Sequence, residues 1–167
     1  MAKVTLRGKE QHTIGELPST GGKAPDFCLT TTALKDVSLA DYSGKTKLLY
    51  IVPSLDTPVC ATSTKKIDEL TGTHSDVVVL IVSADLPFAM GRFCGMEKLK
   101  NVIPLSMMRS KHFAKDYGVL LTDGPLAGVT ARAVVIVDDK DEVVYSQWVD
   151  EISDEPDYNG IIAVLDR

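Results

Sequence analysis

Two apolar stretches with a helical segment between them constrain the fold of this chain more than any other feature. Residues 48–52 (LLYIV) and 77–82 (VVVLIV) are apolar throughout, which is typical of strands that are covered on both faces of a sheet. Residues 61–70 favour a helix that stops near Gly72, because glycine commonly follows the last helical turn. The succession of strand, helix and strand predicts a right-handed βαβ unit with parallel strands.

A cysteine lies where the first of these strands passes into the helix. With Thr57 as the N-cap, Pro58 takes the first helical position and Cys60 lies in the first turn. Unpaired amides and the helix dipole favour a thiolate there, and such sites lower a cysteine pKa from about 8.5 to roughly 3.5–7.5. Ligands of open α/β sheets also bind beyond the carboxyl ends of the strands. Cys60 is therefore a candidate nucleophile, although a cysteine that only packs at a helix start would fit the same position.

Charge and hydropathy argue against two classes of partner. The net charge of -5, without any cluster of Lys and Arg, disfavours a surface that binds nucleic acid. The apolar stretches are far shorter than the ~20 residues that span a bilayer, and the first residues lack the apolar core of a signal peptide. We expect a cytoplasmic protein with one domain over residues 1–167, in which residues 1–17 form an N-terminal hairpin extension.

The cysteine count argues against a structural disulfide framework and leaves inert core cysteines, metal ligands or redox chemistry. Cys28, Cys60 and Cys94 are odd in number and form no C-x-x-C pair, which disfavours a secreted disulfide scaffold. The three histidines are scattered without the spacing of metal ligands, so we expect neither a metal nor a cofactor. Cys28 falls in a predicted strand, residues 26–30, and is expected to be a buried structural thiol.

The rest of the chain alternates between short strands and short helices. A helix is expected after Asp85 as N-cap, and it is weak because Gly91 and Gly95 bracket Cys94. Further expected elements are a hairpin (4–6 and 12–14), strands 26–30 and 37–39, a turn 41–45, an edge strand 102–105, helix 110–117, loop 121–130, a hairpin (131–137 and 142–149) and helix 156–165. Together they predict an α/β fold with a central mixed β-sheet flanked by helices, of the thioredoxin-like kind, with an N-terminal β-hairpin.

Several separated motifs carry a resemblance to a known family. The pattern Pro53-x-x-x-Thr57-x-x-Cys60 resembles the active-site motif of peroxiredoxins. Residues 54–60, 83–89, 92–95 and 131–135 are similar to the bacterial thiol peroxidases, which are atypical two-cysteine peroxiredoxins. The similarity continues through residues 149–152 and 155–158. It thus covers nearly the whole chain.

The resemblance implies an activity and two catalytic cysteines. Cys60 would be the peroxidatic cysteine, which attacks a peroxide and becomes a sulfenic acid. Cys94 would be the resolving cysteine, which forms a disulfide with Cys60 inside one chain. The implied substrates are hydrogen peroxide and organic (alkyl) hydroperoxides, the implied reductant is thioredoxin, and the implied role is antioxidant defence. The family also forms homodimers.

Three further residues gain roles from the resemblance. Thr57 and Arg132 would direct hydrogen-bond donors at the reacting oxygens, with Arg132 also supporting the Cys60 thiolate, and Pro53 would shield the sulfur from water. The residues alone leave simpler explanations open. Thr57 would also serve as a plain N-cap, Arg132 as a surface arginine beside a strand, and Pro53 as a strand terminator.

The resemblance also implies that the structure moves during the cycle. A disulfide requires Cα atoms about 4.4–6.8 Å apart, whereas Cys60 and Cys94 belong to different predicted helices. We expect the Cys94 segment to unwind, helped by its flanking glycines. The apolar side chains around it either pack in the core or form an approach surface for an alkyl hydroperoxide or thioredoxin; they are Phe88, Met90, Phe93 and Met96.

Two alternative functions fit the same fold. A thiol–disulfide oxidoreductase would normally place its cysteines in C-x-x-C, but residues 61–63 after Cys60 are Ala-Thr-Ser. A non-catalytic thioredoxin-like binding module or chaperone gives no reason for Thr57, Cys60 and Arg132 to occur together. The sequence therefore favours a thiol-dependent peroxidase.

Overall fold

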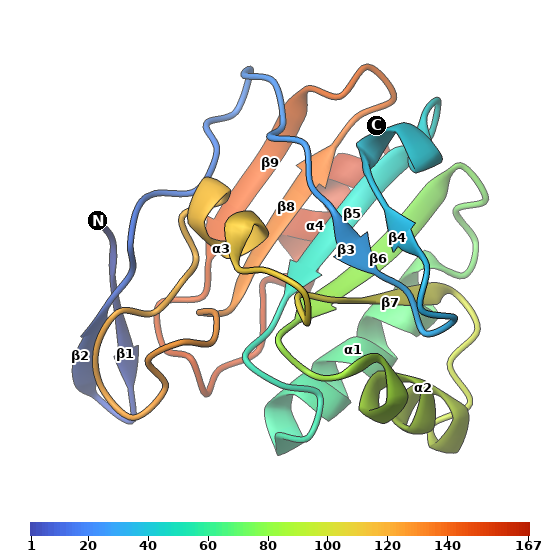
Figure 1. Cartoon of the computed structure of the whole chain (residues 1–167). Helices are drawn as coiled ribbons and strands as arrows, with labels where there is room; N and C mark the ends of the chain where they lie inside the picture. Colours follow the sequence, from blue (N-terminus) through green and yellow to red (C-terminus); the bar gives the residue numbers. More distant parts are fainter.

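A seven-stranded mixed sheet forms the centre of the protein (Figure 1). The computed structural model describes residues 1–167. The strands follow the order β4-β3-β7-β6-β5-β8-β9 across the sheet. Their bounds are β3 Leu29–Thr30, β4 Asp36–Val37, β5 Thr46–Ile51, β6 Val77–Ser83, β7 Val102–Ser106, β8 Ala133–Val137 and β9 Val143–Trp148. The helices are the 3₁₀-helix η1 Leu39–Tyr42, α1 Pro58–Thr71, α2 Pro87–Met96, α3 His112–Asp116 and α4 Tyr158–Leu165.

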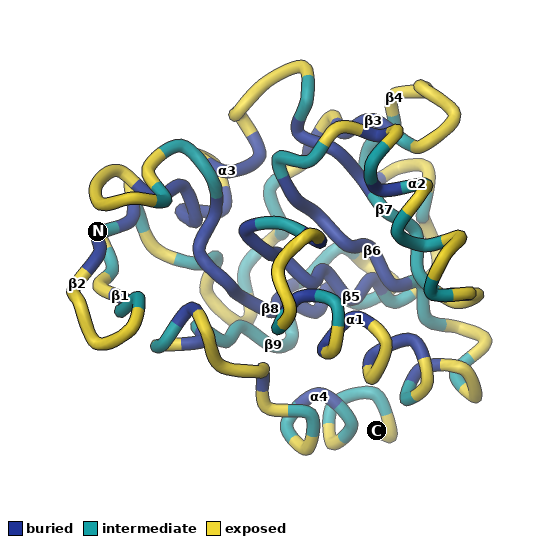
Figure 2. The backbone as a smooth tube through the Cα atoms, turned by 90° about the horizontal axis from the view of Figure 1, so that it is seen from below, coloured by how far each residue is buried: buried dark blue, intermediate teal, exposed yellow.

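The predicted βαβ unit forms the middle of this sheet. Strand β5 pairs in parallel with β6 and antiparallel with β8, and α1 connects β5 to β6. Apart from their first one or two residues, β5 and β6 are buried, and Figure 2 colours most of these central strands accordingly. The mixed α/β fold and the two covered strands are therefore confirmed.

Successive side chains of β5 and of Val52, which follows it, face two separate cores in turn. Leu48, Tyr50 and Val52 belong to the core under α1, α2 and α4, which also contains Cys60. Leu49 and Ile51 belong to the opposite core, which includes side chains of α3 and η1. This alternation follows from the two-residue period of a strand, and it directs Tyr50 toward the helix that carries Cys60.

The N-terminal hairpin is also confirmed. Strands β1 (Lys3–Leu6) and β2 (Lys9–His12) pair antiparallel and form a small sheet of their own, which lies beside the main sheet in Figure 1. Arg7 and Gly8 at its tip have φ values of 52° and 78°, as a two-residue type I′ turn requires. The hairpin packs on the body through a small third core of Val4, Leu121, Ala131 and Ile152.

Several predicted details are wrong. Strand β7 is not an edge strand, because the antiparallel strand β3 pairs with it through Thr30 and Ser106. The N-cap of α2 is Leu86 and not Asp85. The expected turn at 41–45 overlaps the end of the 3₁₀-helix η1. The second strand of the N-terminal hairpin covers 9–12 instead of 12–14. Six elements are one to three residues shorter than predicted, namely β3, β4, α3, β8, β9 and α4.

The expectation for Cys28 is wrong as well. Cys28 is exposed and precedes β3 instead of lying within a strand. Its neighbours Phe27 and Leu29 point inward and are buried. The extended chain therefore turns Cys28 outward.

Among the helices, none is long and apolar enough to cross a membrane.

Packing under α1 gives a test of the fold. Ile67 is 1% exposed and lies in the core beneath α1, so Ile67→Ala should lower the free energy of unfolding by about 2–5 kcal/mol. Urea unfolding followed by the fluorescence of Trp148, the single tryptophan, measures this. Glu69→Ala on the exposed side of the same helix should change it by less than about 0.5 kcal/mol. Equal losses in the two variants would contradict the packing of α1.

Candidate active site

Cys60 is fully buried in the first turn of α1, directly after the loop that follows β5. Thr57 is the N-cap and Pro58 the first helical residue, as predicted. The Thr57 hydroxyl makes no cap bond and instead donates to the carbonyl of Ser54 at 3.0 Å. The amides of Val59 and Cys60 have no hydrogen-bond partner in the protein. The positive end of the helix is thus directed at the sulfur without a side-chain cap.

The guanidinium of Arg132 contacts the sulfur of Cys60. Arg132 lies just before β8 and is only 2% exposed. Its Nη1 donates to Cys60 Sγ at 3.1 Å and to the Tyr50 hydroxyl at 2.9 Å, and its Nε donates to the Ile152 carbonyl at 3.0 Å. Burial opposes the charge, but Tyr50 and Cys60 raise the pKa of Arg132 above its ordinary value. The structure therefore places Arg132 against the Cys60 sulfur and not on the surface.

No carboxylate forms an ion pair with Arg132. Removing a charged group from water without a counter-ion costs several kcal/mol. Burial raises the pKa of the Tyr50 phenol, which Arg132 also contacts, so the sulfur of Cys60 is the contacting group that is available to balance the charge of the guanidinium. The geometry therefore favours a thiolate at this position.

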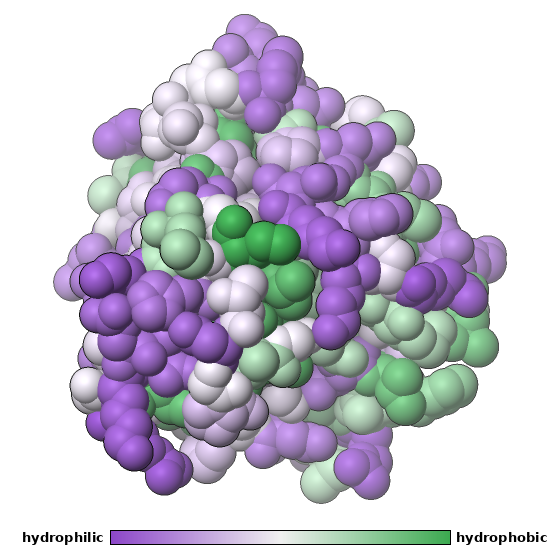
Figure 3. All heavy atoms as spheres, turned by 60° about the vertical axis from the view of Figure 1, so that its left-hand side comes forward, coloured by the Kyte–Doolittle hydropathy of each residue, from purple (hydrophilic) through white to green (hydrophobic).

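A pocket of about 740 Å³ opens beside these residues. The active-site loop contributes Pro53 and Thr57, and Arg132 lies at its inner side. The hairpin, the loop before β8 and the segment after β9 contribute other parts of the wall, through Leu6, Arg7, Lys9, Pro125, Leu126, Val129, Ile152 and Ser153. Figure 3 shows the side of the molecule that carries the hairpin, where a group of apolar side chains is surrounded by hydrophilic ones. The pocket is large enough for an organic molecule.

Comparisons with known proteins place this chain in a family. The Redoxin family model matches residues 19–162. The chain is 47% identical over 165 residues to a thiol peroxidase of Corynebacterium glutamicum, with 99% of both chains covered. It is 48% identical over 165 residues to a thiol peroxidase of Mycobacterium bovis, again over 99% of both. The solved structure of a peroxiredoxin-like protein from Aquifex aeolicus has a TM-score of 0.93 at 37% identity and covers 99% of this chain and 96% of its own.

The chain belongs to the bacterial thiol peroxidases. It is a peroxiredoxin oxidoreductase with a thioredoxin-like fold, as the motifs around Cys60 predict. No group of three or more His, Cys, Asp and Glu side chains is placed to hold a metal ion.

Two polar residues of this thiol peroxidase were missed by the sequence reasoning. The Tyr50 hydroxyl accepts from Arg132 and lies 2.6 Å from the Ser63 hydroxyl, which in turn donates to the Val59 carbonyl at 2.7 Å. Burial raises the pKa of Tyr50 above its ordinary value, so the group is a neutral phenol that both accepts and donates. A tyrosine inside a fully apolar strand was the available signal, because a buried hydroxyl needs a partner.

Asp85 also acts differently from its prediction. Its carboxylate accepts from the Ser54 hydroxyl at 2.7 Å, the Leu55 amide at 2.8 Å and the Ser83 hydroxyl at 2.7 Å. These bonds attach the loop before α1 to the end of β6. Asp85 therefore fixes the loop that carries Pro53, which is buried, and Thr57, which is exposed.

Cys94 of the thiol peroxidase lies on α2 and is half-buried. Burial and the negative charge of Asp68 raise the pKa of Cys94 to about 11, so it is a thiol at neutral pH in this conformation. Cys60 and Cys94 are both free, and the structure is that of the reduced chain.

The four apolar side chains around Cys94 divide evenly between the core and the surface. Met90 is buried and Phe93 packs against the core that contains Cys60. Phe88 and Met96 are 66% and 74% exposed. The core explanation therefore holds for Met90 and Phe93, whereas Phe88 and Met96 lie at the surface.

The contact with Arg132 gives a test of the site. Arg132→Met should slow alkylation of Cys60 by iodoacetamide at pH 7 by about tenfold or more, because a hydrogen bond to a charged group contributes about 1.5–3 kcal/mol. Mass spectrometry of the Cys60 peptide over time measures the rate. Arg109→Met, which breaks an exposed pair with Asp36, is the matched control and should leave the rate unchanged. Equal alkylation rates in all three proteins would contradict a charged sulfur.

Proposed function

We propose that this enzyme reduces hydrogen peroxide and organic hydroperoxides to water and alcohols through Cys60, with Cys94 and thioredoxin completing the cycle. The main support is the buried guanidinium of Arg132, which lies 3.1 Å from the sulfur and has no carboxylate partner. It favours the thiolate that peroxide chemistry needs.

In the first step the Cys60 thiolate attacks the terminal oxygen of the hydroperoxide. A sulfur–oxygen bond forms, the O–O bond breaks, and Cys60 becomes a sulfenic acid while the alkoxide or hydroxide leaves and takes a proton from water. Donors fixed before the reaction stabilise the charge on the leaving oxygen. The Arg132 guanidinium and the unpartnered amides of Val59 and Cys60 are such donors.

Thr57 and Pro53 take supporting roles at the mouth of the site. The Thr57 hydroxyl uses its proton on the Ser54 carbonyl, which leaves its oxygen free to accept from the O–H of a hydroperoxide. Thr57 and Pro53 both line the pocket. Buried Pro53 keeps water from the sulfur without offering it a donor.

In the second step the Cys94 thiol attacks the sulfenic sulfur and water leaves, so that a Cys60–Cys94 disulfide remains. Cys94 must first leave its half-buried place beside Asp68, where its pKa is about 11. A thioredoxin dithiol then supplies two electrons and restores both thiols. The exposed Phe88 and Met96 on α2 offer it an apolar contact surface.

The cellular setting follows from this cycle. A disulfide that must be reduced at every turnover suits the cytoplasm, where thioredoxin keeps thiols reduced. We also propose that the enzyme is a homodimer. Sedimentation equilibrium of the reduced and the oxidised enzyme tests this oligomeric state.

A thiol–disulfide oxidoreductase is less well supported. Such an enzyme must present its reactive sulfur to a protein disulfide, whereas the side chain of Cys60 is 0% exposed. The pocket beside it admits a small hydroperoxide but not a folded protein.

Cysteine variants test the assignment of the two steps. Cys60→Ser should abolish peroxide consumption coupled to thioredoxin, because it removes the nucleophile. Cys94→Ser should keep the first oxidation but lose turnover. After one equivalent of peroxide, intact mass should fall by two hydrogens in the wild type and rise by one oxygen in Cys94→Ser. Cys28→Ser, at an exposed thiol, is the control and should behave as the wild type. Full turnover without Cys94 would contradict its role.

Hydrogen exchange tests the proposed unwinding of α2. We expect the amides of residues 86–96 to lose protection in the disulfide form, because Cys94 has to move toward Cys60. Gly91 and Gly95 within α2 lower the cost of that change. Helix α4 should keep the same protection in both redox states. Equal protection of α2 in the two states would count against unwinding.

A further inference from the structure

The carboxylate of Glu151, between β9 and α4, is surrounded by hydrogen-bond donors. Oε1 accepts from the Arg7 amide at 2.8 Å and from the hydroxyl and amide of Ser153 at 2.6 and 3.3 Å. Oε2 accepts from the Thr5 hydroxyl at 2.5 Å and the Gly8 amide at 3.1 Å. The Ser153 and Thr5 hydroxyls and these amides hold the pKa of Glu151 far below its usual range. Three of the donors, those of Thr5, Arg7 and Gly8, belong to the N-terminal hairpin.

Two amides of the hairpin tip converge on this carboxylate. Arg7 has a φ of 52°, a left-handed conformation that is unfavourable for a non-glycine residue. This conformation, followed by Gly8 at 78°, turns two successive amides toward one point, where they bind an anion. Glu151 supplies that anion, so its charge fixes the shape of the tip.

The same tip forms part of the pocket wall. Leu6, Arg7 and Lys9 line the pocket together with Arg132 and Thr57. Hydrogen peroxide consists of two oxygens and needs only the space beside Arg132. An organic hydroperoxide also carries an apolar group, which needs the remaining space of the pocket, including the part that the tip lines.

The contacts of Glu151 are separate from those that position Arg132. The Arg132 Nε bonds to the carbonyl of Ile152, and backbone bonds tie this segment to Thr5, with Thr5 N to Asp150 O at 2.7 Å and Ile152 N to Thr5 O at 2.8 Å. None of these uses the carboxylate. Loss of its charge would therefore free the tip without displacing the guanidinium.

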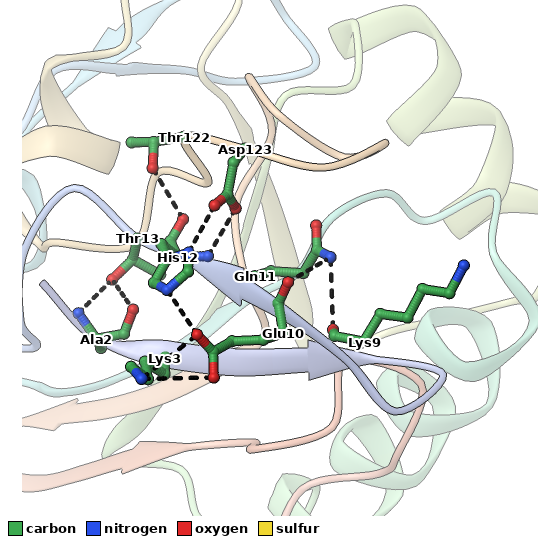
Figure 4. Close-up of polar contacts among 9 residues, drawn as sticks. All are labelled: Ala2, Lys3, Lys9, Glu10, Gln11, His12, Thr13, Thr122 and Asp123. Carbon is green, nitrogen blue, oxygen red and sulfur yellow. Dashed lines mark hydrogen bonds and ion pairs between the residues drawn. The ribbon is translucent and has the colours of Figure 1, made fainter.

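The base of the hairpin has its own anchor. His12 contacts Asp123 at 2.6 Å and Glu10 at 2.9 Å, and Glu10 also pairs with Lys3 (Figure 4). The amide of His12 donates to Asp123 as well. Glu10 is thus a suitable control for Glu151, because its carboxylate also anchors the hairpin but does not contact the tip.

We propose that Glu151 is a positioning residue, which holds the hairpin tip in place as a wall of the pocket and thereby sets the affinity for organic hydroperoxides but not for hydrogen peroxide. This role rests on the proposed peroxidase function. It divides the enzyme into a sulfur end that performs the chemistry and a tip that recognises the organic group.

Glu151→Gln tests the role. It keeps the size of the side chain but removes its charge and replaces one accepting oxygen by an N–H₂ group, which faces donors and cannot accept from them. With thioredoxin-coupled turnover, we expect KM for cumene hydroperoxide to rise roughly fivefold or more at unchanged kcat, and kcat/KM for hydrogen peroxide to stay within about twofold. The Arg7 and Gly8 amides should exchange faster with solvent. Glu10→Gln should change neither substrate's constants. Thr5→Val removes one of the donors to Glu151 and should raise KM for cumene hydroperoxide by a smaller factor. This variant provides the test if Glu151→Gln does not fold.

The outcomes separate this role from the proposed function. Equal changes for both peroxides would show that Glu151 acts through the fold or through Arg132, and unchanged KM for cumene hydroperoxide would show that the tip does not contact the substrate. Either result, in a wild type that reduces hydrogen peroxide, overturns the role alone. A wild type that consumed neither peroxide would overturn the proposed function and this role together.

Discussion

The contact between the buried guanidinium of Arg132 and the sulfur of Cys60 is the interaction on which the site depends. A charge removed from water needs compensation, and here it comes from the Tyr50 hydroxyl, the Ile152 carbonyl and the sulfur. These groups come from different places: the C-terminal end of β5, the segment after β9 and the first turn of α1. The sheet, helix and C-terminal segment must all be in place before the charge is compensated, so assembly of the fold and formation of the thiolate are coupled.

The same electrostatics bear on the later steps of the proposed cycle. A sulfenic acid or a disulfide has no full negative charge, so oxidised Cys60 compensates Arg132 less well than the thiolate does. The first turn of α1 then loses stabilisation at the moment when Cys94 has to approach. Helix α2 is suited to yield, because Gly91 and Gly95 lie within it and each glycine costs roughly 1 kcal/mol relative to alanine. Both changes favour opening in the oxidised enzyme over the reduced one.

Local patterns in the sequence were enough for the central fold but not for side-chain partners. The apolar stretches gave β5 and β6, and the Thr57-Pro58 pair gave the start of α1. Arg132 joined Cys60 only through the family resemblance, because a contact across 72 positions leaves no local signal. Asp85 looked like an N-cap but serves the loop before α1, and β7 looked like an edge strand because its pairing with β3 is also long-range. Glu151 had no sequence signal for its contact with the hairpin, since Thr5, Arg7 and Gly8 lie at the other end of the chain.

The structure separates the groups that hold the sulfur from those that enclose the rest of the pocket. Cys60, Arg132 and Tyr50 are buried on the central sheet and α1, where packing allows little movement. The hairpin forms its own two-stranded sheet and joins the body through side chains such as Glu151 and His12 and a few backbone bonds. Changes at its tip can therefore alter the shape of the pocket without moving the guanidinium. In the proposed enzyme, this arrangement lets substrate preference vary while the environment of the reacting sulfur stays constant.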